Sequence, residues 1–205
     1  MEEQSYRVMI VEDDHDTARL VSRQLGKLSA EFITVHNGQD AILAIGSVLP
    51  DLLVLDIMMP ALDGLEVLRF LKRKFADQYV PIIMLTARHS KDDVDLGAEY
   101  GCDDYITKPY HRGRIVESAE RLLRMARLEG QYASLQEGQE DAEDDTQGSD
   151  DVEGVRGELV SLRLSMGQML IKEDKRSVAL GHVERAQALD EDNQHALELL
   201  ERIRG

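Results

Sequence analysis

Residues 51–64 read DLLVLDIMMPALDG, and the first half of this stretch decides the fold class. Leu52 to Leu55 are four consecutive apolar residues. Such a run predicts a strand that is buried on both faces, as in the middle of a parallel sheet. The strand then ends on a carboxylate, Asp56. Because carboxylates are rarely buried without a partner, we expect other charged groups to lie opposite Asp56.

Other apolar runs suited to strands alternate with segments whose apolar residues have helical spacing. The expected strands are residues 6–11, 32–35, 52–55, 80–85 and 102–106. The expected helices lie between them and after the last strand, where an amphipathic pattern runs through residues 115–126. Strands that alternate with helices in this way predict an α/β fold with a doubly wound, five-stranded parallel sheet.

Polar residues follow four of the expected strands at the point where each strand ends. They are Glu12-Asp13-Asp14, Asp56, Thr86 and Thr107-Lys108-Pro109. In doubly wound sheets the functional site lies at the carboxyl ends of the strands, so these groups should converge. Clustered carboxylates repel one another unless a cation compensates, and hard oxygen ligands suit Mg²⁺. The pattern lacks the His and Cys ligands that are typical of zinc.

Four motifs in this order resemble the receiver domain of bacterial two-component response regulators: VEDD, VLDIMMPALDG, PIIMLTA and GCDDYITKP. The resemblance covers about residues 5–128 and implies a flavodoxin-like receiver fold. It implies that Asp56 accepts a phosphoryl group from a histidine kinase or phosphotransfer protein. It also implies that Mg²⁺ or Mn²⁺ is held by Glu12, Asp13, Asp56 and the backbone carbonyl of Met58.

The resemblance implies roles for three more residues. Lys108 would place a positive charge beside the acyl phosphate, and its peptide bond to Pro109 would be cis. Thr86 would donate a hydroxyl hydrogen bond to the phosphoryl group, and Tyr105 would fill the space that Thr86 leaves, so that phosphorylation changes the protein surface. For the metal we prefer Glu12 and Asp13 over the pair Asp13 and Asp14, because that register places the first helix as the family has it.

The net charge of −16 is concentrated in one segment. Residues 129–153 hold ten acidic residues and no basic one, whereas residues 1–128 hold 16 Lys and Arg against 21 Asp and Glu. A tract of this composition repels itself and cannot bury enough apolar surface to fold alone. We therefore expect three parts: a receiver domain at 1–128, a flexible acidic linker at 129–154, and a helical output module at 155–205.

The last segment has apolar stripes typical of three short helices, which makes a small all-helical module. Residues 160–193 resemble one tetratricopeptide repeat, with Gly167, Ala179 and Ala186 at its small positions. Arg163 departs from the repeat pattern, since a large aromatic residue is usual there. A generic three-helix bundle is the alternative. One and a half repeats bury little core, so we expect the module to gain surface from a partner.

These features favour a response regulator whose helical module binds a protein target or forms a homodimer. The alternative is a module that binds DNA or RNA, but residues 154–205 carry eight basic and nine acidic residues, which disfavours attraction to phosphates. We do not expect an enzyme, beyond Mg²⁺-dependent phosphorylation of Asp56 and its slow autodephosphorylation. The absence of a long apolar run argues against a membrane partner, and a single cysteine, Cys102, fits the reducing cytoplasm.

Overall fold

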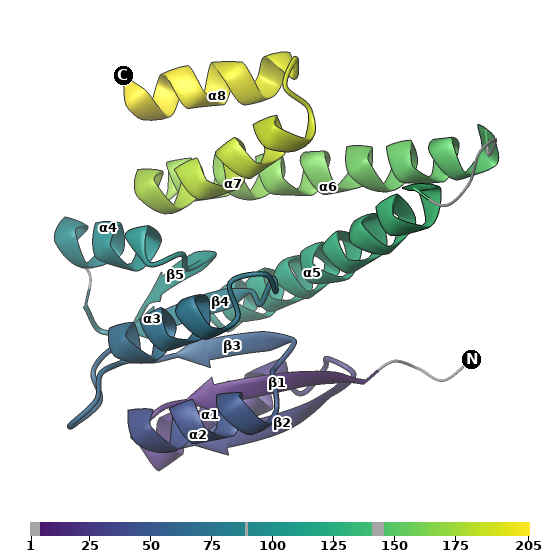
Figure 1. Cartoon of the computed structure of the whole chain (residues 1–205). Helices are drawn as coiled ribbons and strands as arrows, with labels where there is room; N and C mark the ends of the chain where they lie inside the picture. The colour runs from purple at the N-terminus through teal and green to yellow at the C-terminus, as the bar shows by residue number, and fades with distance from the viewer. Residues whose placement is uncertain (1–4, 89, 141–145) are drawn as a thin grey trace. The chain divides into compact units, whose positions relative to one another are not determined.

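The computed structural model describes residues 5–88, 90–140 and 146–205. The chain forms two compact units, Met1–Leu123 and Arg124–Gly205. The first unit contains a sheet with flanking helices, and the second contains helices alone (Figure 1). This confirms the predicted fold class.

The sheet has five parallel strands in the order β2-β1-β3-β4-β5. The strands are β1 (Tyr6–Val11), β2 (Ala30–Val35), β3 (Leu52–Leu55), β4 (Ile82–Thr86) and β5 (Asp104–Thr107). All four residues of β3 are buried, and the strand is central in the sheet, where it pairs with β1 along one edge and with β4 along the other. The strand order reverses direction between β1 and β3, so the carboxyl ends of these two strands form the switch point at which ligands bind in such sheets.

Helices connect the strands and begin at capping side chains. They are α1 (His15–Leu25), α2 (Gly38–Ser47), α3 (Gly64–Lys74) and α4 (Lys91–Glu99), followed by α5 (Arg112–Glu140). Asp14, Asn37, Asp63 and Ser90 each accept a hydrogen bond from a backbone N–H in the first turn of the helix that follows. Such caps satisfy N–H groups that have no partner within the helix. They fix where each helix leaves the edge of the sheet.

The second unit contains the C-terminal part of α5 together with α6 (Thr146–Lys172), α7 (Arg176–Leu189) and α8 (Gln194–Arg204). Its core includes Val160, Leu164, Val183, Ala186, Ala196, Leu199 and Leu200. Gly167 lies at the contact of α6 with α7, because a Cβ there would approach the Val183 side chain to 2.6 Å. The small residue thus lies where the repeat pattern requires one, and the tetratricopeptide resemblance itself stays a prediction.

The described parts of the acidic segment are helical, and residues 141–145 of the predicted linker lie outside the described residues. Helix α5 extends to Glu140 and α6 begins at Thr146, so the described parts of 129–154 are helical. Buried Leu128 on α5 and buried Leu159 on α6 lie on either side of the acidic tract, and both helices are rich in good helix formers. Ion pairs of Arg124 with Glu158 and of Arg163 with Glu129 also join the two helices. Apolar and ionic contacts on either side of the acidic tract therefore stabilise the described parts of α5 and α6, although the tract itself lacks apolar periodicity.

In the part of the chain that the structure describes, no helix combines the length and the apolar character needed to cross a membrane.

Candidate functional site

Two neighbouring strand ends bring three carboxylates together. Glu12 and Asp13 follow β1, and Asp56 follows β3. One carboxylate oxygen from each residue lies within 4.8 Å of the other two. Glu12 and Asp56 are buried, whereas Asp13 is exposed. The predicted acid cluster is therefore assembled, with Asp13 in contact with solvent.

Lys108 supplies the positive charge that buried carboxylates need. Its Nζ donates a hydrogen bond to Glu12 Oε2 at 2.6 Å and another to Asp56 Oδ2 at 2.7 Å. The residue follows β5, and its backbone N–H is bonded to the carbonyl of Thr86 at the end of β4. The Lys108–Pro109 peptide bond is cis. Residues far apart in the sequence thus meet at one edge of the sheet, as their positions after the strands predicted.

The charges at this site shift the pKa values of their partners. Burial raises the pKa of Glu12 to about 7, although the hydrogen bond and charge of Lys108 act in the opposite direction. Burial lowers the pKa of Lys108, but its hydrogen bonds to Asp56 and Glu12 outweigh this effect, so the net shift is upward. Lys108 therefore stays protonated at neutral pH and is a permanent cationic neighbour of Asp56.

The loop after β3 surrounds Asp56 with backbone groups. The Met58 N–H donates a hydrogen bond to Asp56 Oδ1 at 3.0 Å, which places the backbone of Met58 beside the acid cluster. At the end of the loop a Cβ on Gly64 would lie 2.1 Å from the carbonyl oxygen of Asp56, so only glycine fits there. Asp63 and Glu66 form a capping box that begins α3 immediately after the loop. The loop is therefore anchored at both of its ends.

Asp14 lies outside the acid cluster. Its side chain accepts a hydrogen bond from the Thr17 N–H at 2.7 Å and caps α1. Hydrogen bonds from the side chain and then the backbone of Thr17 lower the pKa of Asp14. This geometry agrees with the choice of Glu12 and Asp13 as the acidic pair after β1, because Asp14 is engaged in starting the helix.

The two residues predicted to form the switch are both hydrogen-bonded to the backbone of Arg88. Thr86 is fully buried, and its Oγ accepts a hydrogen bond from the Arg88 N–H at 3.2 Å. The Tyr105 ring is also fully buried, and its hydroxyl donates to the Arg88 carbonyl at 3.1 Å. Burial raises the pKa of Tyr105, which keeps this hydroxyl protonated. The sequence pattern did not single out Arg88, because its backbone rather than its side chain makes both contacts.

The arrangement matches a known family. The profile described as the response regulator receiver domain matches residues 8–120, which is more than half of the chain. The chain belongs to the response regulator receiver family. As a receiver it is a phosphoacceptor of two-component signalling, and receivers bind Mg²⁺ in an acidic pocket.

Named relatives agree with this assignment. The transcriptional regulatory protein TrcR of Mycobacterium tuberculosis is 42% identical over 118 residues, which are 58% of this chain and 45% of TrcR. The response regulator MprA of Mycobacterium ulcerans is 38% identical over 130 residues, which are 63% of this chain and 55% of MprA. The matches thus span about half the length of these curated relatives.

Solved structures show the same domain. The receiver domain of the Francisella response regulator 1452 has a TM-score of 0.54 and 27% identity, and the match covers 58% of this chain and 98% of that one. DrrB, a Thermotoga maritima OmpR/PhoB homologue, has a TM-score of 0.53 and 28% identity over 59% of this chain and 54% of its own. Both therefore support the receiver fold of the first unit.

The donor set at the receiver site fits a hard divalent cation. Three carboxylates, from Glu12, Asp13 and Asp56, and the backbone of Met58 offer oxygen ligands, which Mg²⁺ and Mn²⁺ prefer. The exposure of Asp13 leaves room for the water ligands that Mg²⁺ usually retains. The residues present are therefore compatible with the metal that the family binds.

A second buried carboxylate lies on β5 of the receiver. Asp104 accepts bonds from both terminal nitrogens of Arg114 at 2.6 and 2.7 Å, from the Ser118 hydroxyl at 2.5 Å and from the Tyr105 N–H at 2.8 Å. Both partners of its side chain lie in the first turns of α5. This network fastens α5 to β5, the strand that precedes Lys108. Sequence reasoning missed it, because nothing in the spacing of Asp104, Arg114 and Ser118 indicates their contact.

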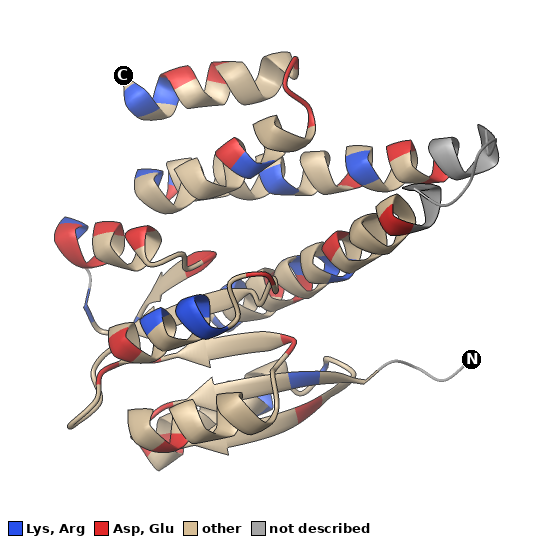
Figure 2. Ribbon diagram, in the orientation of Figure 1, with Lys and Arg blue, Asp and Glu red and all other residues tan. Residues whose placement is uncertain are grey.

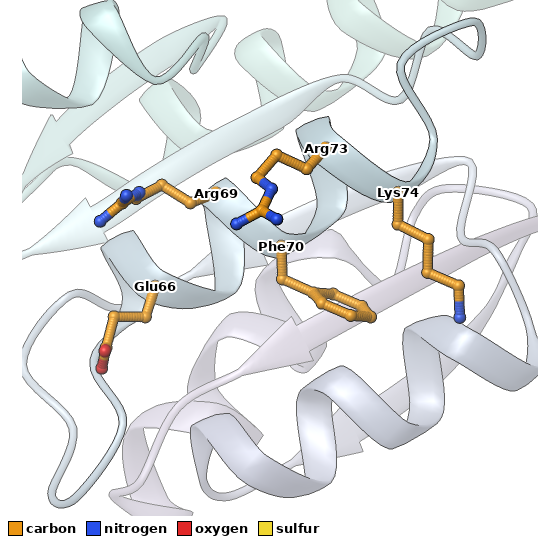
Figure 3. A pocket seen from close by; sticks show the side chains of 5 residues that line it. All are labelled: Glu66, Arg69, Phe70, Arg73 and Lys74. Carbon is orange, nitrogen blue, oxygen red and sulfur yellow. The ribbon is translucent and has the colours of Figure 1, made fainter.

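A pocket of about 490 Å³ lies beside α3, away from the acid cluster. It is lined by Glu66, Arg69, Phe70, Arg73 and Lys74 (Figure 3), and its cations belong to the basic second half of α3 (Figure 2). Arg69 lies 5.2 Å above the Tyr100 ring, and Lys74 lies 5.4 Å from the Phe70 ring. Basic residues in a last helical turn also stabilise the helix dipole. Structural roles thus account for this pocket, and we assign it no ligand.

Proposed function

We propose that this receiver accepts a phosphoryl group on Asp56 from a histidine kinase or phosphotransfer protein and relays the event to its helical unit. The observation that carries the proposal is the position of the Asp56 carboxylate. It lies beside Glu12 and Asp13, and 2.7 Å from the ammonium group of Lys108. From the described residues it accepts two hydrogen bonds, one from Lys108 and one from the Met58 N–H. A carboxylate in this setting has lone pairs left for a reaction.

The proposed reaction is a phosphoryl transfer between a donor histidine and Asp56. An oxygen of Asp56 forms a bond to phosphorus while the bond from phosphorus to the donor imidazole nitrogen breaks. The electron pair of that bond stays on the imidazole, which takes up a proton. Lys108 stays beside the new acyl phosphate and offsets its charge.

Glu12, Asp13, Asp56 and the Met58 carbonyl would hold Mg²⁺ or Mn²⁺ at this site. When bound, the cation supplies positive charge that lets a carboxylate and an anionic phosphoryl group approach each other. The exposed side chain of Asp13 marks the side from which a donor reaches Asp56. The Met58 side chain, in the loop after β3, is also exposed.

The relay would begin at the backbone of Arg88. If Thr86 turns its hydroxyl toward a phosphoryl group, the bond that it accepts from the Arg88 N–H is lost. The Arg88 carbonyl, which holds the Tyr105 hydroxyl, belongs to the same segment between β4 and α4. A change at Thr86 would therefore reach Tyr105 and the packing around α4 and β5.

A phosphorylation assay tests the assignment of Asp56. The full chain is incubated with a small phosphoramidate and Mg²⁺, and incorporation is measured by intact mass. We expect one phosphoryl group on the wild type and on Asp51→Asn, a matched control at the other end of β3, and none on Asp56→Asn. A base-labile phosphoryl group on Asp56→Asn would contradict the proposal.

For the helical unit we propose binding to a protein target or to a second copy of the chain. Ion pairing in this unit supports a protein target over nucleic acid. Most of the basic side chains for which the structure describes a contact are paired with acidic side chains. The pairs are Arg124–Glu158, Arg156–Glu153, Arg163–Glu129, Lys175–Glu173, Arg176–Asp174 and Arg204–Glu184. Paired cations attract phosphates weakly. The name of TrcR keeps nucleic acid as the alternative.

Sedimentation and binding measurements on the full chain separate these outputs. We expect addition of Mg²⁺ and beryllofluoride to change the sedimentation coefficient of the wild type, but not that of Asp56→Asn. We expect no retention of a labelled DNA duplex or RNA hairpin at physiological salt in either state. Retention that depends on beryllofluoride would favour the nucleic-acid alternative.

A further inference from the structure

The first residue of α2 touches the loop that follows Asp56. A Cβ on Gly38 would lie 2.4 Å from the carbonyl oxygen of Leu62 and 2.5 Å from its Cδ2. The φ of Gly38 is not positive, so its backbone would accept alanine. Glycine is therefore required at position 38 by the close approach of Leu62 and not by the backbone conformation.

Leu62 belongs to the loop that carries the Met58 backbone. The loop starts at Asp56, whose side chain accepts a hydrogen bond from the Met58 N–H. It reaches Leu62 through Ala61, which has a φ of 67°. The Leu62 N–H is bonded to the Pro60 carbonyl at 2.9 Å, so this end of the loop is a tight turn. The contact with Gly38 is where α2 supports that turn.

We propose that Gly38 is a positioning residue for the metal site. Because glycine has no side chain, the turn at Leu62 can pack directly against α2, and this contact determines the position of the Met58 carbonyl. The inference rests on the proposed function, because it assumes that this carbonyl is a ligand of the bound cation. Gly38 itself does not touch the metal site.

The size of the contact decides whether the effect is measurable. An ordinary Cβ contact is at least 3.4 Å, so alanine at position 38 requires Leu62 to move by about 1 Å from its 2.4 Å approach. The nearest atom is a backbone oxygen, so a change of side-chain rotamer cannot relieve the clash. Mg²⁺ demands nearly ideal octahedral geometry with ligand distances of about 2.0–2.1 Å. A loop displaced by this amount no longer presents its carbonyl correctly.

The test compares Gly38→Ala with Gly46→Ala in the full chain. Gly46 lies on the same helix and is exposed, and its Cβ would meet only the mobile end of Lys74 at 3.3 Å. We expect Gly38→Ala to weaken Mg²⁺ binding about tenfold or more, as for other residues that support metal ligands, and Gly46→Ala to leave it unchanged. Calorimetric titration gives the affinity, and urea unfolding shows that each variant is folded.

A second variant covers the case in which Gly38→Ala does not fold. Leu62→Ala removes the side-chain part of the contact without adding a clash, and we expect it to weaken Mg²⁺ binding several-fold. Wild-type affinity in a folded Gly38→Ala overturns the inference, and so does wild-type affinity in Leu62→Ala if Gly38→Ala is unfolded. An equal loss in Gly46→Ala also overturns it. A wild type that does not bind Mg²⁺ at all would instead contradict the proposed function.

Discussion

Asp56 and Asp104 are both buried carboxylates at strand ends that face a basic side chain, yet they are built differently. Asp104 accepts four hydrogen bonds, two of them from one arginine, which fills the roughly four lone-pair sites of a carboxylate. Asp56 accepts one bond from Lys108 and one from the Met58 N–H. Its other neighbours are acids, Glu12 and Asp13, which repel it.

The difference separates a structural ion pair from the site that we propose to react. A saturated carboxylate such as Asp104 has nothing left to offer a ligand, and its fixed partner holds α5 on the sheet. The unsaturated Asp56 lies among like charges and keeps free lone pairs toward the exposed Asp13. The count of bonds made, rather than burial or the presence of a cation, distinguishes the two sites.

The largest effect should follow from breaking the saturated pair. Arg114→Ala leaves Asp104 as a buried charge without its main partner, which typically costs about 3–5 kcal/mol of unfolding free energy. Asp56→Asn should change that free energy by less than about 1 kcal/mol. Urea unfolding followed by circular dichroism measures both. Equal losses in the two variants would remove the distinction drawn between the two carboxylates.

Cys102, near the start of β5, reports the same loss locally. Its thiol is buried, and burial raises its pKa, so reaction with a thiol reagent at pH 8 requires the structure to open. A loss of about 3 kcal/mol in Arg114→Ala should speed the labelling of Cys102 by about 100-fold, since each 1.4 kcal/mol is a factor of ten. The rate in Asp56→Asn should stay near that of the wild type. Rapid labelling of the wild type would show that Cys102 is not protected.

A smaller loss is expected at the reactive site. Lys108→Ala should cost about 1–2 kcal/mol, because the cluster meets solvent and Glu12, with its pKa of about 7, can take up a proton. Mg²⁺ binding should persist, since Lys108 supplies no ligand, but the response to beryllofluoride should be lost. NMR spectra with and without beryllofluoride test this. A full response in the variant would contradict the role of Lys108.

The smallest effect should come from an exposed pair. Arg124 and Glu158 are both largely in solvent, and such pairs contribute about 0.2–1 kcal/mol. Arg124→Ala should therefore change the unfolding free energy by about 0.5 kcal/mol. A loss of unfolding free energy as large as that of Arg114→Ala would mean that burial and the number of hydrogen bonds do not determine how much these ion pairs stabilise the protein.

The sequence predicted the sheet and the acid cluster because both depend on short-range patterns. The run Leu52–Leu55 marks a central strand, and parallel strands place Glu12, Asp56 and Lys108 at one edge whatever lies between them. The bonds of Asp104 could not be predicted in this way. They depend on the angle at which α5 crosses the sheet, which no periodicity contains. The fit of Gly38 to Leu62 likewise exists only once the loop is folded.

The acidic segment shows a second limit of pattern reading. Composition alone indicated a linker at 129–154, yet its described residues continue α5 and begin α6. Those helices are stabilised by contacts with each other, among them the ion pair of Arg163 with Glu129, between residues that are distant in sequence. In the described part of the second unit no large apolar side chain is exposed, so its core is more complete than three short helices implied.

The contacts of Arg88 have a consequence for how the proposed switch can evolve. Thr86 and Tyr105 are both held by the backbone N–H and C=O of residue 88, and every amino acid except proline supplies both groups. The side chain at that position is therefore free to change without breaking either bond. A link made of main-chain atoms leaves no trace in aligned sequences, and relatives can differ at residue 88 while keeping the same connection.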